Sequence, residues 1–310
     1  MDRDVAAYAP ATVSNVACGF DIMGFALDEP GDKVTVRFSR GKDVTIRRIS
    51  GCTSTLPMNP ARNTAGAPVI EMLKHCRVRR GVEIEIRKGL PAGSGIGSSA
   101  ASAVAAAVAC NALLGAGLSK EEILTFALHG EKIASGGVHV DNLSPSLWGG
   151  FILVRGYDPL DIVQIPISAP MWCVIVRPHM EIRTKESRKM LPRTVPLSDV
   201  VRQTGNAAGL VAGLMSGDFG LISRSLHDVI AEPARRHLIP GFADMKSAAL
   251  DAGALGCSLS GSGPSVFALA KSKRTARQIG IAMGSILNSV SCPHSVIVSG
   301  ISSAGARIIS

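Results

Sequence analysis

The sequence has 310 residues, of which 46% are hydrophobic and only 4% aromatic, so it can form one large or two medium domains around a core of Ala, Val, Leu and Ile. Its formal net charge of +9 suits anionic ligands, but the basic residues are spread out and aromatic residues for base stacking are scarce, so we expect no nucleic-acid partner. The seven scattered cysteines argue against a disulfide framework or zinc site, and no apolar run is long enough to cross a membrane, so we expect a cytoplasmic protein without a membrane partner.

In the first half of the chain, alternating apolar and polar residues predict strands, and helical spacing predicts helices. The strands are expected at residues 5–9, 33–38, 43–47, 82–87 and 149–155. The helices are expected at residues 69–75, 100–109 and 121–133, the last opened by a capping box of Ser119 and Glu122.

The glycine-rich segment between the strand at 82–87 and the helix at 100–109 is the most informative feature. Gly93, Gly95 and Gly97 alternate along it, followed by Ser98 and Ser99. Glycine allows positive φ and close approach of the backbone to a ligand. A loop that opens a helix also directs unpaired N–H groups at an anion, usually a phosphate.

Two common nucleotide-binding motifs fit this loop less well. A P-loop requires a lysine that this segment lacks, and the dinucleotide fingerprint fails because the third glycine comes one residue early. The segment could instead be a flexible linker without a ligand, but the strand before it and the alanine-rich helix after it argue against a linker.

A Pro-rich connection at residues 157–170 precedes a second set of elements. Strands are expected at residues 172–176, 265–270 and 294–298. Helices are expected near residues 198–215, 219–231, 240–252 and 274–287. Mixed strands and helices in two halves predict an α+β architecture with the active site in the crevice between the halves.

The segment from Pro91 to Ser102 resembles the phosphate loop of the GHMP small-molecule kinases, and motifs in order from residue 8 to about residue 264 resemble the homoserine kinases of that superfamily. This resemblance implies a two-domain α+β fold. Residues 1–168 would form an ATP-binding, ribosomal S5 domain 2-like N-terminal domain, and residues 169–310 a ferredoxin-like C-terminal domain. It also implies a homodimer.

For ATP, the resemblance implies contacts from the loop and from two residues outside it. The loop residues are Pro91, Gly93, Ser94, Gly95, Ile96, Gly97, Ser98 and Ser99. Asn63 matches an adenine-contacting asparagine, and Lys88 is placed to reach a phosphate. Phosphoryl transfer also calls for Mg²⁺, which prefers oxygen ligands. We expect Ser98 or Ser99 and the family's metal-ligand glutamate, Glu131, to supply them, with Ser99 and Glu131 also catalytic.

For L-homoserine, four further segments supply candidates, at residues 9–21, 139–150, 184–192 and 232–240. The expected contacts are Asn15, Asp21, His139, Asp141, Asn142, Thr184, Arg188 and Arg235. A carboxylate suits an α-ammonium group, and a guanidinium grips a carboxylate with two hydrogen bonds. Arg188 and Asp141 are also catalytic candidates, and Asp141 stays open between a base toward the acceptor hydroxyl and a group that holds the substrate.

These observations predict ATP-dependent phosphorylation of the homoserine side-chain hydroxyl to O-phospho-L-homoserine, a step of threonine biosynthesis. Three alternatives stay open: a related kinase of mevalonate or a sugar, a ligand-binding regulator of the same fold without turnover, and, last, a nucleic-acid-binding module. The carboxylate of Asp21 favours an amino-acid substrate, because mevalonate and sugars lack an α-ammonium group.

Overall fold

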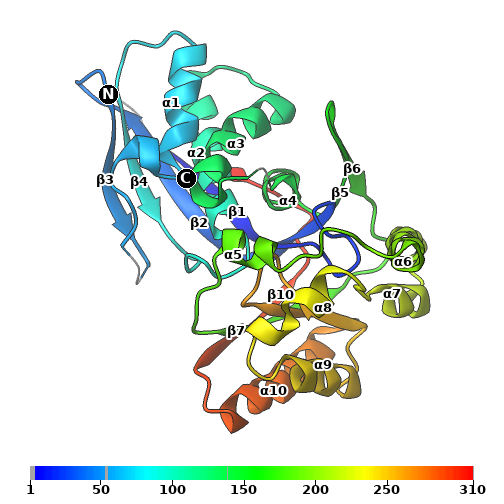
Figure 1. The fold of residues 1–310 in the computed structure, drawn as a ribbon. Coiled ribbons are helices and arrows are strands. Elements are labelled where there is room, and N and C mark those ends of the chain that lie inside the picture. The colour runs from blue at the N-terminus through cyan, green and yellow to red at the C-terminus, as the bar shows by residue number, and fades with distance from the viewer. Residues whose placement is uncertain (1–3, 53–54, 138, 310) are drawn as a thin grey trace.

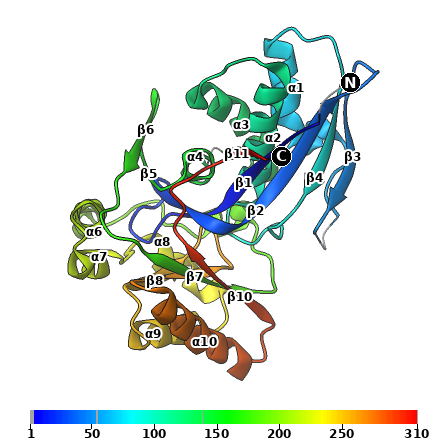
Figure 2. The same ribbon diagram turned by 180° about the vertical axis from the view of Figure 1, so that it is seen from behind.

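Two β-sheets organise the residues that the computed structural model describes, which are 4–52, 55–137 and 139–309. Figures 1 and 2 show helices α1–α4 on one face of the first sheet, and helices α9 and α10 beneath the second. Along the described residues, no helix combines the length and apolar character needed to cross a membrane.

The first sheet has seven strands, and its main path runs β11-β1-β2-β4-β3, with β5 beside β2 and β6 beside β5. Only β3 and β4 pair in parallel. The strands are β1 (Val5–Ser14), β2 (Met23–Phe38), β3 (Val44–Ser50), β4 (Val82–Arg87), β5 (Phe151–Tyr157), β6 (Leu160–Ile165) and β11 (Arg307–Ile309).

The helices of the first half lie on one face of this sheet (Figure 1). They are the 3-10 turn η1 (Pro60–Arg62), α1 (Gly66–His75), α2 (Ser98–Leu114), α3 (Lys120–Ser135) and α4 (Val140–Trp148). Helix α2 packs on β1 and β2, and its alanines, which carry only a Cβ, leave room for close approach. The predicted capping box of α3 is confirmed.

The second sheet is antiparallel, in the order β10-β7-β9-β8. Its strands are β7 (Trp172–Pro178), β8 (Gly256–Leu259), β9 (Val266–Ala270) and β10 (His294–Gly300). The helices around it are α5 (Thr184–Lys189), α6 (Leu197–Ser216), α7 (Phe219–Ser225), α8 (Ala231–Arg235), η2 (Arg236–Leu238), α9 (Phe242–Asp251) and α10 (Lys273–Ser289).

Strand β7 shows why the two halves hold together. Successive side chains of a strand point to opposite faces. Cys173 and Ile175 face the core shared with the first sheet, whereas Val174 and Val176 face the core beneath α9 and α10. Phe267 of β9 also reaches across and meets Phe25 of β2 edge-on, with ring centroids 6.1 Å apart. The second sheet is therefore buried on both faces.

The α+β fold predicted from the sequence is confirmed, with several corrections. The division at residues 168 and 169 falls between the sheets, but β11 returns the end of the chain to β1. The connection at 157–170 contains strand β6. Helix α7 ends at Ser225 rather than residue 231, and α4, α5, α8, β8, β11 and the two 3-10 turns were not predicted. Each missed element is short and depends on its neighbours for pairing or packing.

A buried ion pair ties the end of β4 to β2 and α2. The ammonium group of Lys88 pairs with Asp32 and donates to Ser98 O at 2.9 Å and Ser102 Oγ at 2.8 Å. The other oxygen of Asp32 accepts the N–H groups of Gly89 and Leu90 at 2.9 and 3.2 Å. Both side chains are buried. The pair therefore fixes where the glycine loop leaves the sheet and where α2 begins.

We expect Asp32→Ala to lower the free energy of unfolding by about 3–5 kcal/mol, because it leaves the Lys88 ammonium buried without its counter-charge. Urea unfolding measures this. The matched control is Asp161→Ala, which removes the partner of Arg155 from an ion pair on the protein surface and should cost less than about 1 kcal/mol. Equal losses in the two variants would contradict the role given to the buried pair.

Candidate active site

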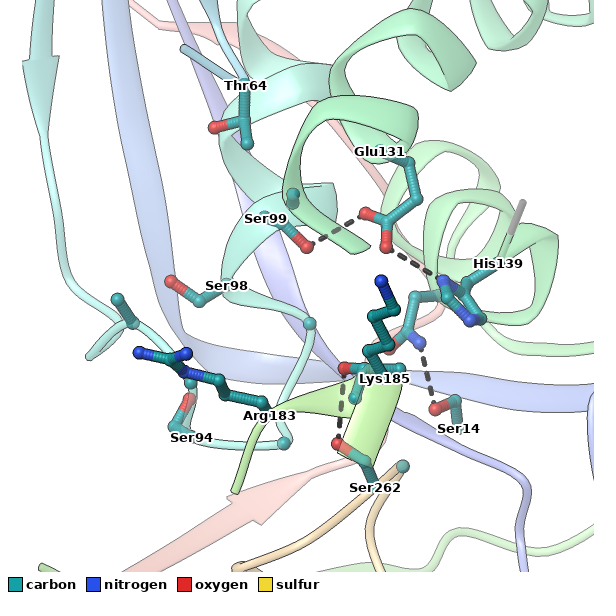
Figure 3. Close-up of a pocket in the computed structure, with 18 of the residues that line it drawn as sticks. Ser14, Thr64, Ser94, Ser98, Ser99, Glu131, His139, Arg183, Lys185 and Ser262 are labelled. Carbon is teal, nitrogen blue, oxygen red and sulfur yellow. Dashed lines mark hydrogen bonds and ion pairs between the residues drawn. The ribbon is translucent and has the colours of Figure 1, made fainter. Parts of the chain in front are cut away.

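A cavity of about 620 Å³ lies between the two halves of the chain. The first half contributes the glycine loop, the end of α3 and the start of α4, and the second half contributes residues around α5, Arg235 of α8, and the turn between β8 and β9. Figure 3 shows side chains from both halves directed into this space. The crevice predicted from the sequence is therefore present.

The glycine loop has the backbone that its sequence predicts. Gly93, Gly95 and Gly97 have φ angles of +64°, +77° and +69°, which only glycine adopts at little cost. Gly97 is the N-cap of α2, and no side chain caps that helix end. Ser94 Oγ is buried at the cavity wall without a hydrogen-bond partner among the described residues. The loop thus presents unsatisfied donors to an anion.

A chain of polar contacts runs from the loop into the cavity (Figure 3). Ser99 Oγ donates to Glu131 Oε2 at 2.8 Å, and the other Glu131 oxygen meets His139 Nδ1 at 3.0 Å. Burial lowers the pKa of His139, but the hydrogen bond and charge of Glu131 outweigh it, so the net shift is upward. Glu131 is only 4% exposed, so its carboxylate is buried rather than solvated.

Arg188 continues this chain to the far wall. Its Nε donates to His139 Nε2 at 3.2 Å, and its two terminal nitrogens grip Asp21 at 3.0 and 2.6 Å. The ring of Phe20 lies 5.6 Å from the Arg188 guanidinium and 5.1 Å from that of Arg235. One aromatic side chain therefore positions both arginines.

Asp141 and Asn142, at the start of α4, have different surroundings. Asp141 is 2% exposed and its Oδ1 has no hydrogen-bond partner among the described residues. Burial, followed by the charge of Asp21, raises the pKa of Asp141 to about 7. The amide of Asn142 is held by Thr12 and Ser14, both at 2.9 Å. Asn142 is thus fixed in orientation, whereas Asp141 keeps a free acceptor.

The remaining predicted substrate contacts also line the cavity. Asn15 donates to Gly261 O at 2.8 Å and accepts the N–H of Asp21 at 3.0 Å, so it joins the first motif to the turn after β8. Thr184 Oγ1 lies 3.4 Å from Ser262 Oγ. Arg235 is 3% exposed, donates to Ser187 O at 3.2 Å, and has a pKa lowered by burial and then by Arg188.

Four residues predicted to contact ATP have side chains that are engaged elsewhere or lie away from the cavity. Lys88 has all three ammonium N–H groups engaged by Asp32, Ser98 O and Ser102, so it has no free donor for a phosphate. Ile96 is fully buried in the core, and neither it nor Pro91 lines the cavity. Asn63 lines the cavity, but its amide is bonded to Pro57 O and Ala65 N, which gives it a part in shaping the wall.

The two serines after Gly97 have different hydrogen-bond partners. Ser98 Oγ donates to Leu90 O at 3.1 Å, whereas Ser99 Oγ faces Glu131. The sequence left open which serine accompanies Glu131, and the geometry points to Ser99.

Sequence reasoning missed Asp32, Phe20 and Lys185. No local pattern distinguishes them from a turn aspartate, an ordinary aromatic residue or a surface lysine, because their partners lie far away in the sequence. Lys185 and Arg183 both line the cavity from the second half of the chain (Figure 3).

Comparisons with known proteins agree with this geometry. Residues 63–150 match the family "GHMP kinases N terminal domain", and residues 210–286 match "GHMP kinases C terminal". The chain belongs to the GHMP kinases. Family membership implies that ATP is the phosphoryl donor, and the glycine loop described above lies within the N-terminal match.

Relatives match along nearly the whole chain. A homoserine kinase of Chlorobium phaeovibrioides is 47% identical over 99% of this chain and all of that protein, and one of Xylella fastidiosa is 40% identical over 98% and 93%. The crystal structure of a homoserine kinase from Cytophaga hutchinsonii has a TM-score of 0.95 and 49% identity, covering 99% and 97%. A mevalonate kinase from L. major, with a TM-score of 0.72 and 19% identity, shares the fold alone.

We expect Gly97→Ala to abolish measurable ATP binding. A Cβ at residue 97 would overlap Thr12 Oγ1, in addition to the cost of placing alanine at positive φ. Gly115 is the matched control, because it caps the other end of α2 with φ +60° and nothing lies within 4 Å of an added Cβ. Gly115→Ala should cost about 1 kcal/mol of stability and leave ATP binding intact. Titration calorimetry and urea unfolding measure both effects, and equal ATP affinities would contradict the prediction.

Proposed function

We propose that this chain transfers the γ-phosphoryl group of ATP to the side-chain hydroxyl of L-homoserine, giving O-phospho-L-homoserine for threonine synthesis. The observation that carries the substrate assignment is the placement of Asp21, Arg188 and Arg235 around Phe20, in the wall of the cavity that the glycine loop also lines. The homoserine kinases that match the whole chain support it. A homodimer and a cytoplasmic location stay predictions.

The proposed amino-acid site holds one acidic and two basic side chains of its own. Arg188 and Asp21 form an ion pair, and a zwitterionic amino acid carries the same two charges in complementary positions. The α-ammonium group of the substrate would pair with Asp21 in place of Arg188. The freed guanidinium of Arg188 would then bind the α-carboxylate of the substrate, together with Arg235. A substrate without an ammonium group offers Asp21 no cation in exchange for Arg188, so it gains less from this site than an amino acid does. This favours homoserine over mevalonate or a sugar.

The residues beside the loop suit a magnesium ion. Ser99 and Glu131 offer a hydroxyl and a carboxylate oxygen 2.8 Å apart, and Mg²⁺ is commonly held by one or two protein oxygens plus substrate phosphates. The described residues hold no cluster of three or more His, Cys, Asp or Glu suited to a metal, which fits an ion held largely by phosphates. When bound, Mg²⁺ would neutralise phosphate charge.

The transfer breaks the bond between the γ-phosphorus and the oxygen that leaves with ADP. It forms a bond from that phosphorus to the homoserine side-chain oxygen, which loses its proton. Asp141 is a buried carboxyl group of the cavity wall whose Oδ1 has no hydrogen-bond partner among the described residues, so we propose that it accepts the hydrogen bond of this hydroxyl, orients it and takes up its proton. The loop holds the donor phosphates, and orientation of the two reactants supplies much of the rate gain.

The test of the proposed function is coupled ADP release with Mg-ATP and, in parallel, L-homoserine, L-serine, mevalonate or galactose. Turnover confined to L-homoserine is the expected result. Mevalonate and galactose lack the α-ammonium group, and the hydroxyl of L-serine is one carbon closer to the α-carbon than that of L-homoserine. Turnover on mevalonate or galactose would reject the amino-acid site while keeping the kinase. No turnover on any of the four would favour the ligand-binding regulator.

For the metal site, we expect Glu131→Gln to lower kcat by about 100-fold or more, since it removes the proposed carboxylate ligand. Glu121→Gln is the control, because Glu121 lies exposed in the first turn of the same helix. Unfolding curves should show that both variants are folded. Normal turnover of Glu131→Gln at limiting Mg²⁺ would reject Glu131 as a ligand.

A further inference from the structure

The glycine loop offers no lysine of its own to the transferred phosphoryl group. In the transition state of the transfer, the phosphoryl group carries negative charge on its equatorial oxygens, and kinases place cations beside it. The glycine loop holds no lysine between Gly93 and Ser102. Lys88, next to the loop, is committed to Asp32, Ser98 O and Ser102. The stabilising cation must therefore come from elsewhere in the cavity wall.

Six cationic side chains line the cavity. They are Arg62, Lys88, Arg183, Lys185, Arg188 and Arg235. Arg188 and Arg235 are engaged at Asp21, His139 and Ser187 O. Arg62 comes from η1, in the first half of the chain. Arg183 and Lys185 are the two that the second half contributes without a hydrogen bond or ion pair of this kind among the described residues.

These two residues come from a segment that closes over the loop from the second half of the chain. At Gly93, an added Cβ would overlap the side chain of Glu181, so the segment that leads into α5 rests directly on the loop. At Ser187 and Thr184, α5 is also anchored to Ser262 through hydrogen bonds of 3.2 and 3.4 Å. The position of Lys185, in the first turn of α5, is thus held relative to the loop.

Figure 3 shows that the side chains of Arg183 and Lys185 point to different parts of the cavity. Lys185 points toward the side of the cavity where Ser99, Glu131 and His139 meet, whereas Arg183 is directed toward Ser94 and Ser98. No hydrogen bond or ion pair among the described residues occupies the Lys185 ammonium, in contrast to Lys189 of the same helix, which pairs with Glu186. Lys185 therefore has donors free on the side of the cavity where the proposed metal ligands lie.

We propose that Lys185 is a catalytic residue whose ammonium binds the γ-phosphoryl oxygens of ATP and stabilises them during transfer. This inference rests on the proposed function. Lys185 supplies charge and hydrogen bonds and exchanges no proton, so the bonds made and broken are those of the transfer already described. Because the loop and Lys185 belong to different halves of the chain, the complete phosphate site requires both.

The kinetic test compares Lys185→Met with Lys189→Met, which removes a lysine that lies exposed on the same helix. We expect kcat with L-homoserine to fall about 100-fold or more in Lys185→Met and to be unchanged in Lys189→Met. The KM for L-homoserine should stay within about threefold, because the lost contact is to phosphate. Lys185→Arg should recover part of kcat, since it restores the charge. A raised KM for L-homoserine with unchanged kcat would overturn the inference and place Lys185 at the amino-acid site.

A binding test separates this inference from the proposed function. Calorimetry with ADP and with a non-hydrolysable ATP analogue reports the γ-phosphate contact without turnover. Lys185→Met should weaken binding of the analogue about tenfold while ADP affinity is kept, and Arg183→Met is tested alongside it. Loss of analogue affinity only in Arg183→Met, or equal losses for ADP and the analogue in Lys185→Met, would overturn the inference. Failure of the wild-type enzyme to phosphorylate L-homoserine would instead reject the proposed function.

Discussion

The buried contact between Lys88 and Asp32 constrains the rest of the active site. A lysine and an aspartate taken out of water must satisfy each other and their remaining hydrogen bonds, or the fold is penalised by several kcal/mol. Here Asp32 also accepts two backbone N–H groups at the start of the glycine loop, and Lys88 donates to the first turn of α2. Strand β2, the end of β4, the loop and α2 therefore have one relative position that satisfies every group.

This constraint explains why the loop can be built almost entirely from glycine and serine. Glycine contributes little stability of its own and loses much conformational freedom on folding. The loop is held instead by its ends and by contacts such as Ser265 Oγ to Ser94 O at 2.6 Å and Ser260 Oγ to Gly95 O at 2.7 Å. Both serines belong to the second half of the chain. The loop is thus held by hydrogen bonds from both halves of the chain.

The turn at residues 15–17, which leads to Asp21, shows a different use of backbone constraint. Asn15, Val16 and Ala17 have φ angles of +69°, +39° and +57°, which is unusual for residues with a side chain and costs energy, most of all for a β-branched valine. The hydrogen bonds of Asn15 to Gly261 O and Asp21 N hold this turn in place. The strain is consistent with a segment shaped to direct Asp21 at Arg188 rather than to maximise stability.

The sequence alone determined the features that depend on local backbone chemistry. Alternating glycines favour positive φ and an alanine run favours a close-packed helix, whereas the roles expected of Glu131, His139 and Asp21 rested on the resemblance of their motifs to the kinase family. Only the tertiary structure decided which groups are free. Lys88 and Asp32 lie 56 residues apart, and Arg188 and Asp21 lie 167 apart. Whether a charged side chain faces a partner or a cavity depends on such distant contacts, and for that reason the phosphate contact predicted for Lys88 is now proposed for Lys185.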